Sequence, residues 1–134
     1  MSADANTKTI MSVYEAFGRG DVAAILDAVT DDVDWASEAA WTAAPWYGIR
    51  RGKDTVAAFF AEFGSTMEVE EFTPVSVAAN DTDVLTVVRF RARARATGKT
   101  AAMDLHHYFA FRDGKIAYYR GTEDTAQTQG TLEP

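Results

Sequence analysis

The sequence TAAMDLHHYFAFRDGKIAYYR, residues 100–120, predicts a hairpin of two strands joined by a tight turn at Asp113-Gly114. An Asp-Gly pair between two alternating segments is a strong hairpin signal, because both turn residues tolerate positive φ. Apolar and polar side chains alternate through both arms, and a strand presents successive side chains to opposite faces of its sheet. We therefore expect a hairpin with one buried face and one outer face.

The two histidines of the protein are adjacent in this hairpin, so they point to opposite faces. His106 shares the outer face with Asp104, whereas His107 lies on the inner face with the apolar side chains Leu105, Phe109 and Phe111. An inward histidine either serves packing, with a carbonyl or carboxylate as its partner, or belongs to a site. Because the two rings diverge, no metal site is predicted.

Composition is that of an ordinary globular chain. The 134 residues predict one domain over 1–134, with an ordered core at about 5–125 and a polar tail at 126–134 that frays. A net charge of −7 argues against a nucleic-acid surface, and the lack of cysteine excludes disulfides and thiolate chemistry. No apolar run reaches the ~20 residues of a membrane span, and the start of the sequence lacks the layout of a signal peptide. We therefore expect a cytoplasmic protein.

Periodicity predicts helices first and strands afterwards. Apolar residues at helical spacing indicate three helices, at about 7–17, at 22–29 and from 52 or 54 to 63. Period-two alternation indicates a short strand at 30–37, then strands at 67–79 and 84–97 and the two arms of the hairpin. Pro74 predicts an edge position or a bulge. This order predicts an α+β fold in which a cone-shaped, curved antiparallel sheet wraps three N-terminal helices and leaves a cavity between them.

The strand at 84–97 alternates strictly and pairs with the first arm of the hairpin across the Thr97-Gly98 turn. This pairing places Val88 opposite His107, and the inward side chains of the strand are Val84, Thr86, Val88, Phe90, Ala92 and Ala94. Across the hairpin turn, Tyr118 is expected opposite Phe109 and Arg120 opposite His107. We therefore expect Arg120 beside His107 in the cavity, with Asp124 as its carboxylate partner.

The outer face of the same strands is rich in arginine and tyrosine. Arg91 is expected opposite Asp104, and Arg89 opposite His106. This face is either solvated and carries cross-strand ion pairs or is a subunit interface, because Tyr and Arg are enriched at interfaces. We favour the interface, and hence a homodimer whose contact residues are Arg89, Arg91, Arg93, Asp104, His106, Tyr108 and Tyr119.

Three further features border the predicted cavity. Residues 38–51, EAAWTAAPWYGIRR, are irregular, and their aromatic rings either pin a loop to the core or line a pocket mouth. Tyr14 lies on the buried stripe of the first helix, where most tyrosines are core residues with a partner for the hydroxyl. Ser37 ends the short strand on its inward face, but no G-x-S-x-G motif surrounds it, so a nucleophilic serine is not predicted.

The order and content of these elements resemble the nuclear-transport-factor-2-like superfamily, in its SnoaL-like and ketosteroid-isomerase-like branch. The resemblance lies in VYEAFGRGDVAAIL, TDDVDW, GIRRGKDTVAAFF and HHYFAFRDGKIAYYR, and it covers nearly the whole chain. It implies a cone with an apolar pocket, often in a homodimer, and functions that range from isomerisation and ring closure to epoxide hydrolysis and ligand binding. It also implies that Tyr14 stands at the oxyanion tyrosine of the isomerases, His107 at their protonated aspartic acid, and Ser37 at or beside their base.

We expect an acid–base enzyme of the isomerase, cyclase or hydrolase type, without metal or cofactor, for a small cyclic or aromatic molecule. His107 would transfer protons, Tyr14 would donate to an oxyanion, and Arg120 with Asp124 would orient or polarise the substrate. The residues expected to line the pocket are Trp35, Ser37, Trp41, Trp46, Tyr47, Phe59, Phe63, Val88, Met103, Leu105, Phe109 and Tyr118. Two alternatives remain: a module that binds an apolar ligand unchanged, and an accessory dimer whose own aromatic rings fill the pocket.

Overall fold

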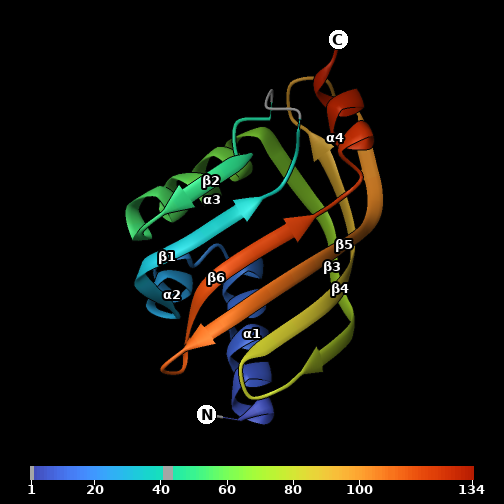
Figure 1. Ribbon diagram of the computed structural model, residues 1–134. Coiled ribbons are helices and arrows are strands. Elements are labelled where there is room, and N and C mark those ends of the chain that lie inside the picture. Colours follow the sequence, from blue (N-terminus) through green and yellow to red (C-terminus); the bar gives the residue numbers. More distant parts are fainter. Residues whose placement is uncertain (1, 41–43) are drawn as a thin grey trace.

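The computed structural model describes residues 2–40 and 44–134. The helices and strands follow the predicted order, with one further strand and one further helix (Figure 1). They are α1 (Ala3–Gly18), α2 (Val22–Asp27), β1 (Val29–Ser37), β2 (Gly48–Arg51), α3 (Lys53–Thr66), β3 (Met67–Ala79), β4 (Asp83–Ala94), β5 (Thr100–Arg112), β6 (Lys115–Thr122) and α4 (Thr125–Leu132). No helix in the described part of the chain is long and apolar enough to cross a membrane.

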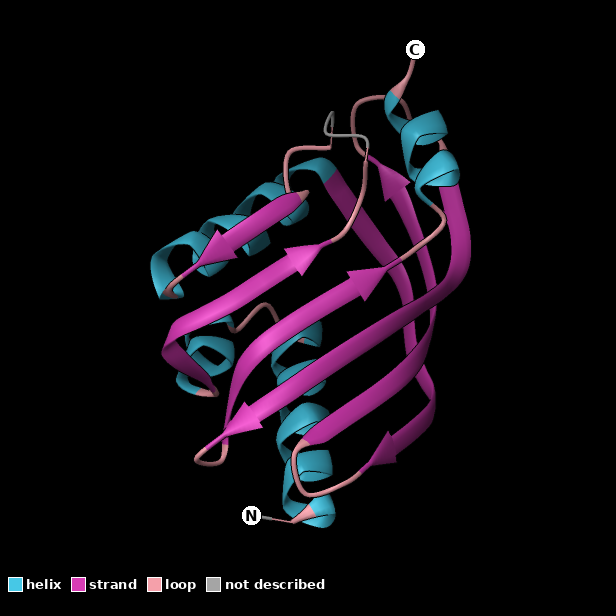
Figure 2. Cartoon of the chain, viewed as in Figure 1, coloured by secondary structure: helices cyan, strands magenta, loops and turns pink. Residues whose placement is uncertain are grey.

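The six strands form one curved, unclosed sheet in the order β2-β1-β6-β5-β4-β3. Neighbouring strands are antiparallel except β1 and β6, which run parallel. Figure 2 shows the first three helices on one side of the sheet, where the curve of the strands encloses α1. The predicted α+β fold is therefore confirmed, and the space between helices and sheet becomes the interior of the molecule.

Local sequence signals explain how the first helices begin and end. The Ser2 side chain accepts a hydrogen bond from the backbone N–H of Ala5 and caps α1, and Asp21 caps α2 in the same way through Ala24. The apolar stripe of α1 is buried at Ile10 and Val13. Both helices thus turn an apolar face toward the sheet, as the spacing predicts.

The turn between β5 and β6 has the predicted geometry, with positive φ at Asp113 (53°) and Gly114 (78°). The predicted register of β6 is wrong, because a bulge between Ala110 and Phe111 shifts the pairing by one residue. His107 therefore lies opposite Gly121 rather than Arg120. A shift of one residue exchanges the two faces of a strand.

The register between β4 and β5 differs from the predicted register by two residues. A shift of two residues leaves each side chain on the predicted face of the sheet. His107 pairs with Thr86 and not with Val88, and Arg89 pairs with Asp104. The inward residues of β4 are buried as predicted. At the sheet edge, β3 contains register shifts at Val69/Glu71 and Pro74/Ser76, so the bulge expected at Pro74 is present.

The C-terminal segment was expected to fray, and this expectation is wrong, because it forms α4. Asp124 caps this helix by accepting from Gln127 N at 3.2 Å. Tertiary hydrogen bonds then hold it against β5 and the turn that precedes β5: the Thr97 hydroxyl donates to the Thr131 carbonyl, and the Ala102 N–H donates to Gln127 Oε1. The segment lacks an apolar stripe, so its own sequence carries little signal for this packing.

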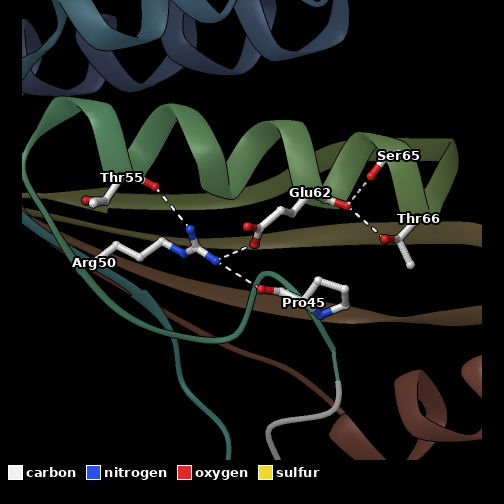
Figure 3. A network of polar contacts seen from close by, with 6 residues as sticks. All are labelled: Pro45, Arg50, Thr55, Glu62, Ser65 and Thr66. Carbon is white, nitrogen blue, oxygen red and sulfur yellow. Dashed lines mark hydrogen bonds and ion pairs between the residues drawn. The ribbon is translucent and has the colours of Figure 1, made fainter.

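An arginine network fixes the irregular segment onto α3. The Arg50 guanidinium donates to the carbonyls of Pro45 (2.9 Å) and Thr55 (3.2 Å) and pairs with the Glu62 carboxylate (Figure 3). Trp46 and Tyr47 follow Pro45 directly and are both buried. The network therefore holds two aromatic side chains at the interior of the fold.

Candidate functional site

A cavity lies between the inner face of the sheet and the helices α1 and α3. The space that water molecules can occupy in it is about 80 Å³. Its walls are mostly aromatic and aliphatic, and they include Val13, Phe17, Trp35, Trp46, Phe59, Phe60, Phe63, Met67, Phe72, Phe90, Leu105 and Phe109. Such a lining excludes charged ligands and favours a small apolar molecule.

Three polar side chains meet at one part of this wall. The Tyr14 hydroxyl of α1 lies 2.6 Å from Thr86 Oγ1 of β4 and 2.8 Å from His107 Nδ1 of β5. The antiparallel pairing of Thr86 with His107 places these two side chains side by side, and α1 crosses above them. His107 retains some accessible surface, and that surface faces the cavity because β5 turns this residue inward.

Burial determines the charge state of this group. Desolvation, with a smaller contribution from the neighbouring His106, lowers the pKa of His107 from 6.5 to about 3. Burial also raises the pKa of Tyr14 above its ordinary value, although the hydrogen bond with Thr86 opposes this rise. Both side chains are therefore neutral at physiological pH.

The hydrogen bonds also assign the direction of donation. If Thr86 donates to Tyr14 and Tyr14 donates to His107 Nδ1, each buried hydroxyl has an acceptor, and the proton of the neutral imidazole lies on Nε2. The reverse order leaves the Thr86 hydroxyl without an acceptor in the described part of the chain. We therefore assign the first order, in which the Nε2–H of His107 is a donor that no described side chain accepts.

Tyr119 occupies the inner face of β6, where Arg120 was expected. Its ring packs on Trp35 at a centroid distance of 4.1 Å and on Phe109 at 5.0 Å. Glycine is required at position 121, because a Cβ there would lie 2.2 Å from the Tyr119 hydroxyl oxygen. Burial raises the pKa of Tyr119 well above its usual value, so this hydroxyl is neutral as well.

Glu123 supplies a carboxylate that sequence reasoning missed. It follows the end of β6, lines the cavity and accepts hydrogen bonds at Oε2 from the hydroxyls of Tyr47 (3.0 Å) and Thr128. Burial raises the pKa of Glu123, and these two hydrogen bonds oppose the rise. The alternation Tyr119, Gly121, Glu123 is a signal that would have found it, had the bulge at Ala117 of β6 been known.

Two of the predicted catalytic residues do not reach the cavity, because the bulge reverses their faces. Arg120 lies on the outer face, pairs with Asp34 at 2.9 Å and Glu38 at 3.5 Å, and stacks over the Tyr118 ring at 4.2 Å. Asp124 is exposed and caps α4. The predicted pairing of Arg120 with Asp124 is therefore wrong.

Most of the predicted lining residues do border the cavity. Those that do, apart from His107 and Tyr14, are Trp35, Ser37, Trp46, Phe59, Phe63, Leu105 and Phe109. Val88 is fully buried in the core, Met103 packs against the core, and Tyr47 reaches the site through Glu123. Tyr118 lies on the outer face, and Trp41 lies outside the described residues.

Comparison with known proteins agrees with the fold. Residues 11–119 match the family model of the SnoaL-like domain. The chain belongs to the SnoaL-like domain family. No curated protein matches the sequence. The SnoaL-like chain is similar in structure to nuclear-transport-factor-2-like proteins from Burkholderia xenovorans (25% identity, 99% of each chain, TM-score 0.88) and Burkholderia pseudomallei (24%, 97% of this chain and 98% of that one, TM-score 0.90).

A third similar structure is a candidate polyketide cyclase from Xanthomonas campestris, with 20% identity, 98% of each chain covered and a TM-score of 0.80. At this identity the similarity establishes the fold alone. As for metals, the residues that the structure describes contain no group of three or more His, Asp and Glu side chains placed to bind an ion. The chemistry of this SnoaL-like site must therefore be argued from its own side chains.

Proposed function

We propose that the cavity binds a small, mostly apolar cyclic or aromatic molecule through a carbonyl oxygen, and that the protein is an acid–base enzyme of the isomerase or cyclase type. The observation that carries this proposal is the donor at His107 Nε2, which the chain Thr86–Tyr14–His107 directs to an apolar cavity. His107 keeps accessible surface toward the cavity, so a ligand oxygen can reach this donor, and a hydrogen bond made there contributes about 0.5–1.5 kcal/mol.

A buried donor without a partner among the described residues, the indole N–H of Trp35, also supports a carbonyl ligand. The indole Nε1 of Trp35, a residue that also lines the cavity, has no hydrogen-bond partner in the described part of the chain. The aromatic walls fit a ring, and the donors fit its oxygens. The names of structural neighbours agree with such substrates, since they include the candidate polyketide cyclase, a candidate isomerase and a protein crystallised with polyporic acid.

Two matched probes test the ligand. Cyclohexanone offers a carbonyl oxygen, and methylenecyclohexane has the same shape without an acceptor. Replacing His107 by Leu is expected to raise the Kd of cyclohexanone on the order of 10-fold, because the ketone oxygen loses its donor in a buried site, and to leave that of methylenecyclohexane unchanged or lower. Ligand-observed NMR titration measures both, and His106→Leu, on the outer face, is the control. Equal effects of His107→Leu on the two probes would reject the proposal.

The alternative function is a module that binds the same ligand without changing it. What favours it is Ser37, which lines the cavity at or beside the position where the resemblance to ketosteroid isomerases implies a base, since a serine hydroxyl does not accept protons from carbon at neutral pH. Recovery of a natural ligand unaltered after prolonged incubation would support this alternative.

We also propose a homodimer through the outer face of β4, β5 and β6. The predicted contact residues on this face are Arg89, Arg91, Arg93, Asp104, His106 and Tyr108. Tyr119, also predicted there, is buried in the interior and is not part of this face. Leu85 is 51% exposed and lies opposite Tyr108, so the face combines an exposed apolar centre with charged surroundings. Arg91 and Arg93 already pair with Glu70 and Glu68 of β3.

Light scattering tests the dimer. We expect a mass twice that of one chain at micromolar concentration, and Leu85→Asp should weaken association at least 10-fold, because it places a charge at the apolar centre of the interface. Ile49→Asp, at an exposed apolar residue of β2, is the matched control and should leave the mass unchanged. A monomeric mass for the unaltered protein would contradict the proposal.

A further inference from the structure

The cavity holds few groups that can accept a proton. Its titratable residues, in the described part of the lining, are Tyr14, His107, Tyr119 and Glu123. Burial lowers the pKa of His107 to about 3, so its neutral ring is a weak base, and it raises the pKa values of both tyrosines, which stay protonated. Glu123 is the remaining group and the one carboxylate in this lining.

Glu123 lies where the interior cavity meets an open cleft on the outer side of the molecule. With Ser37 and Thr122 it lines the interior cavity and also an open cleft on the outer side, between the ends of β1 and β6. From that end of β6 the chain runs directly into α4 (Figure 1). Gly121 pairs with His107, and Glu123 follows Gly121 by two residues, so its Cα lies within about 7 Å of the Cα of Gly121. His107 and Glu123 therefore line neighbouring parts of one cavity, where a small ring can contact both side chains.

The hydrogen bonds of Glu123 leave one oxygen available. Tyr47 from the irregular segment and Thr128 from α4 both donate to Oε2. Oε1 has no hydrogen-bond partner among the described residues. The Arg50 network fixes Pro45, two residues before Tyr47, so one of the two donors that orient the carboxylate is itself held in place (Figure 3). The carboxylate is thus oriented by one oxygen and free at the other.

We propose that Glu123 is the proton acceptor of this site, taking a proton from the carbon beside the ligand carbonyl and exchanging it with solvent at the outer cleft. This inference rests on the proposed carbonyl ligand. The C–H bond breaks, an O–H bond forms at Glu123 Oε1, and the electron pair of the C–H bond becomes the C=C bond of an enolate. The enolate oxygen carries the negative charge and accepts the hydrogen bond from His107 Nε2. Return of a proton from Glu123 to carbon completes the cycle without any other reactant.

The surroundings of Glu123 suit this role. Burial raises the pKa of its carboxyl, and the neighbouring charge of Asp124 adds to the rise, while the donors Tyr47 and Thr128 oppose it. A raised pKa makes a carboxylate a stronger base near neutral pH. Activity should therefore rise with pH as Glu123 loses its proton. Replacing Thr128 by Val removes one donor, raises the pKa of Glu123 further and moves this rise to higher pH.

Exchange of the α-protons of cyclohexanone in D2O, followed by NMR, tests the inference. We expect the protein to accelerate exchange, Glu123→Gln to lower the rate at least 100-fold, and both proteins to bind cyclohexanone with Kd values within about 3-fold. Asp124→Asn is the matched control, because it removes the adjacent exposed carboxylate but keeps a side chain that caps α4. At pH values where Glu123 has lost its proton, this variant should exchange the protons of cyclohexanone as fast as the unaltered protein.

The outcomes separate the two proposals. If cyclohexanone binds but Glu123→Gln exchanges its protons as fast as the unaltered protein, or if the unaltered protein gives no acceleration, the assignment of Glu123 is overturned and the proposed ligand class stands. If cyclohexanone does not bind at all, the proposed function fails and this inference fails with it. An unchanged pH profile in Thr128→Val, a variant that keeps the carboxylate, would also count against Glu123 as the base.

Discussion

Replacing His107 by Gln will make the protein markedly less sensitive to acid. In the folded state burial lowers the pKa of His107 to about 3, whereas the unfolded chain keeps the ordinary value of 6.5. Between these values the unfolded state binds more protons, so the free energy of unfolding falls as pH decreases from 6.5 to 3. Each pH unit is worth about 1.4 kcal/mol, which gives a loss of up to roughly 5 kcal/mol that the glutamine variant avoids.

Urea unfolding at a series of pH values between 7.5 and 3.5, at one protein concentration, measures this effect. His106→Gln is the matched control, since that residue is the exposed neighbour on the opposite face, and its pH dependence should stay close to that of the unaltered protein. Glu123 acts in the opposite sense: its raised pKa contributes stability at low pH that is lost as pH rises through that pKa. Both proteins contain Glu123, so its contribution cancels in the difference. Parallel pH curves for the unaltered protein and His107→Gln would show that His107 is not buried as a neutral ring.

The second large effect is expected at Phe109. This ring is 1% exposed and contacts Tyr14, His107 and Tyr119, with centroid distances of 6.3, 5.9 and 5.0 Å. Phe109→Ala should lower the free energy of unfolding by about 3–5 kcal/mol, because it removes a buried ring and leaves a cavity that the sheet cannot close. Chemical denaturation measures the loss, and Ile49→Ala, at an exposed site, should change stability by less than about 0.5 kcal/mol.

Ligand rescue distinguishes a cavity from a general loss of structure. The enlarged space beside His107 is apolar, so benzene should raise the melting temperature of Phe109→Ala more than that of the unaltered protein. A stability loss below about 1 kcal/mol, or equal stabilisation of both proteins by benzene, would contradict the placement of Phe109 at the cavity wall.

Much of the fold follows from local patterns. Helical spacing predicts the buried stripe of α1, and Asp113-Gly114 predicts the hairpin with positive φ at both residues. Strict alternation places Thr86 and His107 on the inner face, which holds even though their pairing differs from the predicted one by two residues. These signals are short-range, because they depend only on which residues lie one, two or four positions apart.

Local patterns do not predict which residues of β6 and of the segment after it face the cavity. Opposite Ala110 and Phe111 of β5, a bulge inserts one extra residue, Ala117, into β6, and so Tyr119 faces the cavity in place of Arg120. The same shift brings Glu123 inward and leaves Asp124 to cap a helix. The pairing of β6 with β1 is also irregular at this point, between Val29 and Asp34, so the bulge involves a strand that lies more than 80 residues earlier in the chain and short-range patterns do not predict it.

Local sequence patterns suffice to predict the order of the elements, the α+β class, the hairpin and the inward direction of His107. Each of these depends on periodicity, turn chemistry or capping, which act between near neighbours. Long-range packing, in contrast, places the Tyr14 hydroxyl between Thr86 and His107 Nδ1, and makes Glu123, oriented by Tyr47 and Thr128, the carboxylate of the cavity. Those contacts join positions up to 93 residues apart, and the register that brings them together is set by hydrogen bonds across the whole sheet.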